Sequence, residues 1–268
     1  MDASTLAHLS DLHIGRSPED DVAAERLCET LLRQRIDHVV VTGDITHRGR
    51  RSEAKQFERI FAPLGDRLTV VPGNHDRAGE DAGAGWMNGQ RVCVKQMPGL
   101  YLVRVDSTGE HNRSIHRSHG ELCAKVLGQV DSALGIARPN SLVILLLHHH
   151  VLPLPEEGFL ERMSTLLGWP FASELPLGLE LLRLAEGRCD LVLHGHRHVP
   201  RAMRLTRESG RSLDILNAGS TTELSRFRLF SHRAGALLGP PRWVRFQESA
   251  SNPLALPSPG LLSYRVAG

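Results

Sequence analysis

Several features that mark specialised protein classes are scarce or missing in this sequence. The 268 residues include four cysteines, widely spaced and without a C-x-x-C pair, which argues against a disulfide framework and against a thiolate zinc site. The 32 basic and 30 acidic residues leave a formal net charge of only +2, so no strong field favours nucleic acid or an anionic membrane. Hydrophobic residues make up 41% of the chain, which is enough for a sizeable core. The composition therefore predicts an ordinary globular protein that does not bind nucleic acid.

Signals for export and for membrane insertion are also missing. The longest unbroken apolar run, Leu142 to Leu147, is far too short to span a bilayer. The N-terminal MDASTLAHLS lacks the basic and then apolar profile of a signal peptide. We expect a cytoplasmic protein without a transmembrane segment. Peripheral contact with the inner face of the membrane and a homo-oligomeric state both stay open.

Short runs rich in Val, Leu and Ile alternate with longer amphipathic stretches, which is the rhythm of an α/β fold. The pattern predicts helices over residues 19–35 and from Ser52, as N-cap, to Phe61. The first helix should bury Val22, Leu27, Leu31 and Leu32 on one face. Strands are expected near residues 5–9, 37–42, 68–72, 100–105, 141–147 and 190–194. With no internal repeat, and with the Pro/Ser-rich stretch at 248–260 interpreted as a surface loop, we expect a single domain over residues 1–268.

Polar side chains follow most of the predicted strands at the point where each strand ends. The segments are DLH (11–13), GDITHRG (43–49), GNHD (73–76), HHH (148–150) and HGHRH (194–198). Because the carboxyl ends of the strands of an open α/β sheet line a common crevice, these groups should converge. Each segment alone is compatible with an ordinary turn. Two aspartates and several imidazoles buried together, however, require a compensating cation.

The types of donor atom indicate which cations these are. Imidazole, carboxylate and amide oxygen without thiolate suit Mn²⁺, Fe or Zn²⁺. Seven candidate ligands exceed what one catalytic ion normally takes, so the sequence favours two divalent ions that share a bridging carboxylate. Such a pair lowers the pKa of a bound water from ~15.7 toward ~7 and clamps the oxygens of an in-line displacement, which predicts phosphoester hydrolysis. The seven candidates are Asp11, His13, Asp44, Asn74, His148, His196 and His198.

The ordered set of motifs resembles the calcineurin-like metallophosphoesterase superfamily over roughly residues 5 to 220. The resemblance implies a four-layer αββα sandwich with a dinuclear metal site at the strand ends, where a metal-bound hydroxide attacks the substrate. It also implies the ligand sets. One ion would be held by Asp11, His13 and His198, the other by Asn74, His148 and His196, with Asp44 bridging.

Three further positions near these motifs have expected roles. His75 resembles the family's histidine that contacts the scissile phosphate and assists the leaving group. For Asp76 two roles stay open: it orients His75, or it caps the turn. Among the consecutive histidines we favour His148 as the ligand, because it comes directly after the apolar run, although His150 replaces a proline of the common family pattern and leaves the register among His148, His149 and His150 open.

Finer features resemble the class III cyclic nucleotide phosphodiesterases and the related glycerophosphodiesterases. The segments GDITHRGRRSEAKQFERI, LVRVDSTGE and LNAGSTTE match the layout of that group. We therefore expect hydrolysis of a small phosphodiester such as a cyclic nucleotide. The alternative is a UDP-2,3-diacylglucosamine pyrophosphatase of lipid A synthesis. A nuclease is disfavoured by the short chain and the small net charge, and a metal-free scaffold by the complete ligand set.

Two apolar segments bear on the choice of substrate. Residues 155–178 place apolar side chains at helical spacing, so they form either a lid, with Phe159 and Trp169 contacting the substrate, or part of the core. Residues 226–246 interleave arginines with aromatic residues. They form either an interfacial surface or two strands of the second sheet whose arginines face water.

Overall fold

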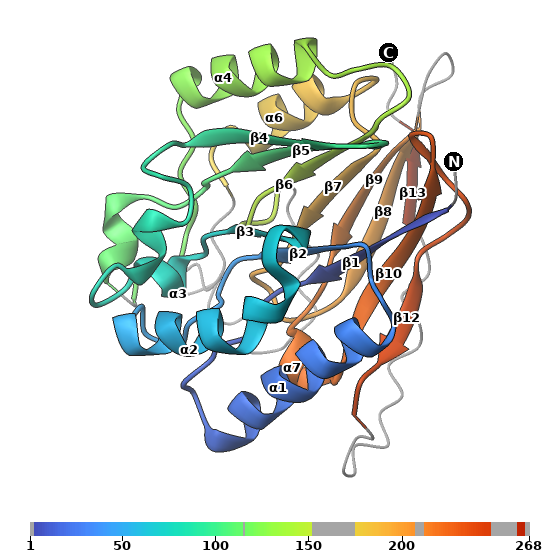
Figure 1. Ribbon diagram of the computed structural model, residues 1–268. Helices are drawn as coiled ribbons and strands as arrows, with labels where there is room; N and C mark the ends of the chain where they lie inside the picture. The colour runs from blue at the N-terminus through green and yellow to red at the C-terminus, as the bar shows by residue number, and fades with distance from the viewer. Residues whose placement is uncertain (1–2, 115, 152–174, 207–211, 248–261, 266–268) are drawn as a thin grey trace.

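The computed structural model describes residues 3–114, 116–151, 175–206, 212–247 and 262–265, which form two β-sheets with helices on their outer faces (Figure 1). In the first sheet the strand order is β11-β10-β1-β2-β3, and β12 also pairs with β10. The central strands β1, β2 and β3 are parallel, whereas β10 runs antiparallel to β1. The strands are β1 (Ser4–Leu9), β2 (His38–Thr42), β3 (Leu68–Val71), β10 (Arg226–Arg233), β11 (Ala236–Leu237) and β12 (Arg242–Arg245).

The second sheet has the order β13-β8-β9-β7-β6-β5-β4. Its central strands β5, β6, β7 and β9 are parallel to one another, and β4 and β8 are antiparallel to their neighbours β5 and β9. The strands are β4 (Val92–Met97), β5 (Leu100–Val105), β6 (Leu142–Leu146), β7 (Leu191–His194), β8 (Arg201–Thr206), β9 (Leu213–Asn217) and β13 (Leu262–Arg265).

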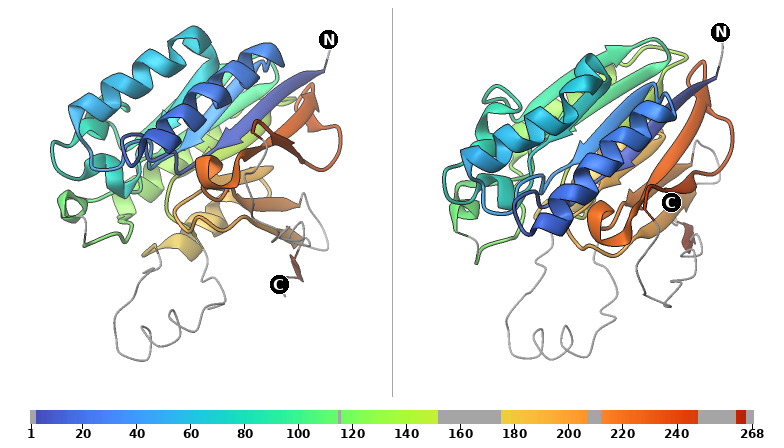
Figure 2. Two further views of the ribbon diagram at one scale, coloured as in Figure 1. Left: turned by 90° about the horizontal axis from the view of Figure 1, so that it is seen from below. Right: turned by 60° about the horizontal axis from the view of Figure 1, so that its bottom comes forward.

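Helices cover the outer face of each sheet. Figure 1 shows α1 (Pro18–Arg33) and α2 (Arg51–Phe61) below the first sheet and α4 (Ala124–Gly135) and α6 (Gly178–Ala185) above the second, and in Figure 2 α1 and α2 lie side by side across the strands. The shorter helices are α3 (Asn74–Arg77), α7 (Thr221–Leu224) and the 3₁₀ helices η1 (Ala62–Arg67), η2 (Ala82–Gly85) and η3 (Glu110–Arg113).

Three buried hydrophobic clusters show that these elements form four layers. Because successive side chains of a strand point to opposite faces, Leu6 and Ala7 of β1 enter different clusters. One cluster fills the space between the sheets (Leu6, Val40, Ile144), one lies between the first sheet and α1 and α2 (Ala7, Leu27, Phe57), and one lies between the second sheet and α4 and α6 (Leu145, Val130, Leu181). The αββα sandwich expected from the sequence is confirmed.

The two predicted helices form with differences at single residues. The first begins after Ser17, whose side chain accepts a hydrogen bond from the Asp20 N–H at 3.2 Å, and Val22 is 45% exposed instead of buried. The second begins before Ser52, so the N-cap expected there is wrong. Glu53 explains the earlier start, because its carboxylate accepts from the Arg50 N–H at 3.3 Å and fixes the chain ahead of Ser52.

The segment that interleaves arginines with aromatics forms β10 and β12, as the strand interpretation expected, but in the first sheet instead of the second. Arg228 does not face water, since it is only 4% exposed. Its guanidinium donates to the carbonyl oxygens of Arg201 and Asn217 at 2.9 and 3.1 Å and lies 4.4 Å from the centre of the Trp243 ring. Arg228 therefore ties the edge of the first sheet to the second. Among the described residues, no helix has the length and hydrophobicity needed to cross a membrane.

Candidate metal centre

The parallel strands of both sheets bring all seven predicted ligands to one place. The residues that follow β1, β2 and β3 meet those that follow β6 and β7, because the backbone hydrogen bonds of the strands continue into the loops. The Asp11 N–H donates to Gly43 O at 3.0 Å, and the Gly195 N–H donates to His148 O at 3.1 Å. Of the seven, the five most deeply buried are Asp11, His13, Asp44, Asn74 and His148, each 5% exposed or less.

One group of donor atoms comes from Asn74, His148 and His196. Asn74 Oδ1 lies 3.1 Å from His148 Nε2 and 3.0 Å from His196 Nδ1, and these two nitrogens are 3.3 Å apart. The other ring nitrogen of His148 donates to Thr42 O at 2.8 Å, so His148 would hold a metal ion through Nε2. The three residues predicted to hold one ion thus converge.

The second group consists of Asp11, His13 and His198. His13 Nε2 lies 2.9 Å from His198 Nε2, which in turn lies 3.5 Å from Asp11 Oδ1. Burial lowers the pKa of His13 to about 3, so its imidazole is neutral, as a metal ligand must be. These are the three residues predicted to hold the other ion.

Two buried carboxylates lie between the groups. Asp44 Oδ2 is 3.3 Å from His148 Nε2, while its Oδ1 accepts from the His75 N–H at 2.8 Å. One oxygen each of Asp11 and Asp44 lies within 4.8 Å of a ring nitrogen of His148, and Asp11 also belongs to the group with His13 and His198. Both carboxylates therefore lie near His148, and Asp11 also belongs to the second group, whereas the family resemblance implied a bridging role for Asp44 alone.

The charges of the site fit bound cations. Burial raises the pKa of Asp11, because its carboxylate has been taken out of water. Burial also opposes a charge on His148, yet the Asp44 and Asp11 carboxylates raise the pKa of that imidazole to about 9. The cluster thus attracts positive charge between its carboxylates, which is the environment that a divalent cation requires.

Backbone strain is concentrated at the same residues. Asp11, His13, Asp44, His196 and His198 all have positive φ, between 48° and 77°. Non-glycine residues rarely adopt this conformation, and it persists only where the surrounding structure imposes it, most often at functional sites. Five of the seven predicted ligands therefore hold an uncommon backbone conformation.

The three consecutive histidines have different surroundings. His149 uses both ring nitrogens, since Nδ1 lies 2.8 Å from Ser107 Oγ and Nε2 donates to Ser118 O at 3.0 Å. The ring of His150 stacks against His196 at 5.7 Å between centroids. His148 is the one whose free nitrogen meets Asn74 and Asp44, which supports the choice of His148 over its neighbours.

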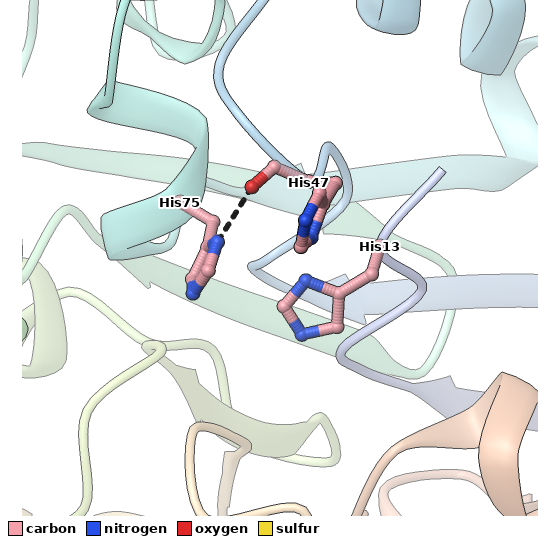
Figure 3. Close-up of side chains that lie close together, drawn as sticks. All are labelled: His13, His47 and His75. Carbon is pink, nitrogen blue, oxygen red and sulfur yellow. Dashed lines mark hydrogen bonds between the residues drawn. The ribbon is translucent and has the colours of Figure 1, made fainter. Parts of the chain in front are cut away.

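His75 lies beside the centre and is held by a residue that the sequence did not suggest. Its Nδ1 donates to the backbone oxygen of His47 at 2.7 Å (Figure 3). The Asp76 carboxylate instead accepts from the backbone N–H groups of Thr46 and Gly73, at 2.7 and 2.8 Å. Of the two roles expected for Asp76, the observed hydrogen bonds match the turn cap, and His47 O orients His75.

A second residue missed by sequence reasoning is Glu223. Its Oε2 lies 3.4 Å from His198 Nδ1, and its other oxygen pairs with Arg16, which also binds Asp20. The hydrogen bond with His198 lowers the pKa of Glu223 to about 2 against the effect of burial, so it is a carboxylate. The motif LNAGSTTE, noted only for its layout, contained this signal.

The same motif supports the ligand loops. Asn217 Nδ2 donates to Gly195 O at 2.7 Å, Ser220 Oγ donates to Asp11 O at 2.9 Å, and Thr221 Oγ1 accepts from the Ser10 N–H at 2.9 Å. These bonds fix the loops that carry Asp11 and His196. Phe159 and Trp169, the predicted substrate contacts, lie outside the described residues, as do most of the predicted lid at 155–178 and the loop at 248–260.

Comparison with known proteins agrees with this geometry. Residues 4–200 match the sequence model of the calcineurin-like phosphoesterase family. A segment of 77 residues is 27% identical to a probable cyclic nucleotide phosphodiesterase from Vesicomyosocius okutanii, covering 27% of this chain and 33% of that protein. The match therefore spans only a third of the relative's length.

Solved structures show the same fold at low sequence identity. A dimetal phosphatase from Danio rerio superposes with a TM-score of 0.59 and 13% identity, over 91% of this chain and 99% of the other. A purple acid phosphatase from yellow lupin seeds gives a TM-score of 0.61 and 12% identity, over 91% of this chain and 52% of the other. With the family match, these results show that the chain belongs to the calcineurin-like phosphoesterase family.

Proposed function

We propose that the protein is a dinuclear metal-dependent phosphodiesterase that hydrolyses a small phosphodiester such as a cyclic nucleotide. The observation that carries the proposal is the convergence of two donor groups, Asn74 with His148 and His196, and His13 with Asp11 and His198, around two buried carboxylates. The partial similarity to a probable cyclic nucleotide phosphodiesterase supports the choice of substrate class.

The residues present fit two divalent ions. Neutral imidazoles, an amide oxygen and carboxylates, with no thiolate among them, suit Mn²⁺, Fe or Zn²⁺. Asn74, His148 and His196 would hold one ion and Asp11, His13 and His198 the other, with Asp44 between them. When bound, such a pair lowers the pKa of a water and neutralises charge on the phosphoryl group.

The protein residues then act on the substrate around this pair. Hydrolysis adds water to phosphorus, breaks one ester P–O bond and gives a proton to the departing oxygen. As the imidazolium, His75 is suited to supply that proton from Nε2, because its Nδ1–H is committed to His47 O. The attacking water loses one proton, which balances the proton given to the departing oxygen. The hydrogen bond from the His75 N–H to Asp44 ties this histidine to the centre.

A substrate panel tests the proposal. Protein loaded with Mn²⁺ would be assayed on phosphomonoesters, cyclic nucleotides and UDP-linked pyrophosphates under identical conditions. The proposal predicts the highest kcat/KM for a small diester. A strong preference for a diacylated UDP-sugar would instead support the pyrophosphatase alternative, and hydrolysis of monoesters alone would contradict the diesterase assignment.

A further inference from the structure

Three histidines from the segments that follow three neighbouring strands form a cluster at the edge of the candidate metal centre. His13 follows β1, His47 follows β2, and His75 follows β3, and one ring nitrogen from each lies within 4.8 Å of the others (Figure 3). The His75 ring is 4.7 Å from His13 in an edge-to-face arrangement and 5.7 Å from His47 in a stacked one. His13 is a predicted metal ligand and His75 a predicted substrate contact, whereas His47 has so far contributed only its backbone oxygen, and its side chain has no assigned role.

Two nitrogens of this cluster lack a partner. Within the described part of the chain, the Nδ1 atoms of His13 and His47 are buried and make no hydrogen bond. Such atoms are rare in folded proteins, because a buried polar atom without a hydrogen-bond partner destabilises the fold. His13 is 2% exposed, and one of its ring nitrogens turns toward His47 and His75 in Figure 3. The cluster therefore has room in its hydrogen bonding for a bound ligand.

The chemistry of the nitrogens decides between a cation and an anion. His13 presents Nε2 to His198, so it would bind an additional cation through Nδ1 only as an imidazolate, which neutral water does not readily produce. His75 has committed its Nδ1–H to His47 O. As a neutral ligand through Nε2, His13 carries its proton on Nδ1, so the cluster offers N–H donors, which suit an oxyanion.

We propose that His47 is a second phosphate-binding residue of this centre, which acts with His75 by donating its ring N–H to a non-bridging oxygen of the bound phosphoryl group. The inference rests on the proposed function, because the oxyanion is the substrate's phosphoryl group or the product phosphate. His75 would give a proton to the departing oxygen, whereas His47 would donate a hydrogen bond to an oxygen that stays on phosphorus. His47 is partly buried and comes three residues after Asp44; its ring lies 5.8 Å from that of His13, but His47 is not one of the seven predicted ligands.

Substitution of His47 can test the role of its ring separately from the role of its backbone oxygen. The contact that orients His75 uses the backbone oxygen of residue 47, which every substitution retains. His47→Ala removes the ring alone, and His47→Gln keeps an N–H donor of similar reach. His232→Ala is a matched control. The buried Nδ1 of His232 also has no hydrogen-bond partner among the described residues, but His232 lies opposite Ser4 in the β1–β10 ladder, at the other end of the first sheet.

The decisive measurement is the binding of inorganic phosphate to metal-loaded protein by calorimetry, with metal content determined on the same samples. We expect His47→Ala to weaken phosphate binding about 10- to 100-fold, the usual loss for a hydrogen bond to a charged group, with two metals retained. His47→Gln should recover part of the affinity and His232→Ala should bind as the wild type does. Loss of kcat/KM in His47→Ala should be equal for esters with good and poor leaving groups.

Other results would overturn the inference. Phosphate affinity within twofold of wild type in His47→Ala would show that the ring does not touch the oxyanion. Loss of metal with that substitution would make His47 a residue that positions His13. A wild-type protein that binds phosphate through His47 but hydrolyses no phosphodiester would contradict the proposed function while leaving this inference standing.

Discussion

Glu223 holds His198 from the side opposite to Asp11: the two ring nitrogens of His198 lie 3.4 Å from Glu223 Oε2 and 3.5 Å from Asp11 Oδ1. A carboxylate behind a metal-binding histidine fixes the orientation of the ring and raises its basicity. Glu223 is itself held by Arg16, which comes from the loop ahead of α1. The His198 ring is thereby fixed by two segments that lie far apart in the sequence.

Glu223→Gln should therefore weaken metal binding selectively. The expected loss is about 10- to 100-fold in affinity for the ion held by Asp11, His13 and His198, and much less for the other. Metal titration followed by calorimetry separates the two sites. Glu180→Gln, which removes an exposed ion pair with Arg183 on α6, is the matched control and should leave both affinities unchanged. Equal loss at both sites in Glu223→Gln would indicate general destabilisation.

His75→Ala should retain both metals and lose about 10²- to 10⁴-fold in kcat, the usual range for a positioned proton-transfer group. The reason is that His75 Nδ1 donates to His47 O, which leaves Nε2 for the substrate, and His75 is not one of the seven predicted ligands. The loss should be larger for esters with poor leaving groups. If metal content falls together with the rate, His75 is a ligand and the assignment is wrong.

Gly195 allows the two sheets to approach each other at the centre. A Cβ atom at this position would collide with Ser10 Oγ and Asp11 Oδ2. Gly195→Ala should therefore displace Asp11 and lower both metal affinity and thermal stability. Gly128 in α4 has open space around its Cα, so Gly128→Ala should leave the melting temperature unchanged or raise it, since alanine favours helix by about 1 kcal/mol. Matching melting temperatures for the two variants would contradict the close approach.

His38 predicts how stability depends on pH away from the metal centre. Burial lowers its pKa to about 3 from the ordinary 6.5, and its Nε2 pairs with Thr69 Oγ1 at 2.9 Å. Below pH 6.5 the unfolded chain takes up a proton that the folded protein refuses, so this contribution is complete above pH 6.5 and is lost as the pH falls toward 3. The loss is at most ~1.4 kcal/mol per pH unit.

Urea unfolding of wild type and His38→Gln at about pH 7 and about pH 5 measures this term, since glutamine does not titrate in this range. The variant should show a smaller decrease in stability between the two conditions. An equal decrease in both proteins would mean that His38 is not neutral in the fold.

The sequence predicted the parts of the molecule that depend on local pattern. Runs such as VILLL and VVV gave the central strands, and the rule that strand ends converge placed Asn74, His148 and His196 together before any geometry was known. The choice of His148 as the predicted ligand among the consecutive histidines rested on its place at the end of an apolar run, and it stays a prediction.

What the sequence did not reveal depends on contacts between distant segments and on backbone atoms. His75 is oriented by the backbone carbonyl oxygen of His47, which any residue could supply, so no feature of the sequence predicts this contact. Glu223 reaches His198 only because α7 folds against the loop after β7. Arg228 faces inward because β10 pairs antiparallel with β1. An alternating pattern of arginines and aromatics does not predict that pairing.

The central claim, a dinuclear centre around the buried carboxylates, is tested most directly by counting transition-metal ions in protein purified without chelator, for wild type and for Asp44→Asn. The account predicts two ions per chain in the wild type, with loss of metal and of most activity in Asp44→Asn, because its carboxylate lies between the two donor groups. A wild-type chain without bound metal, or an Asp44→Asn variant that keeps two ions and near-normal turnover, would contradict it.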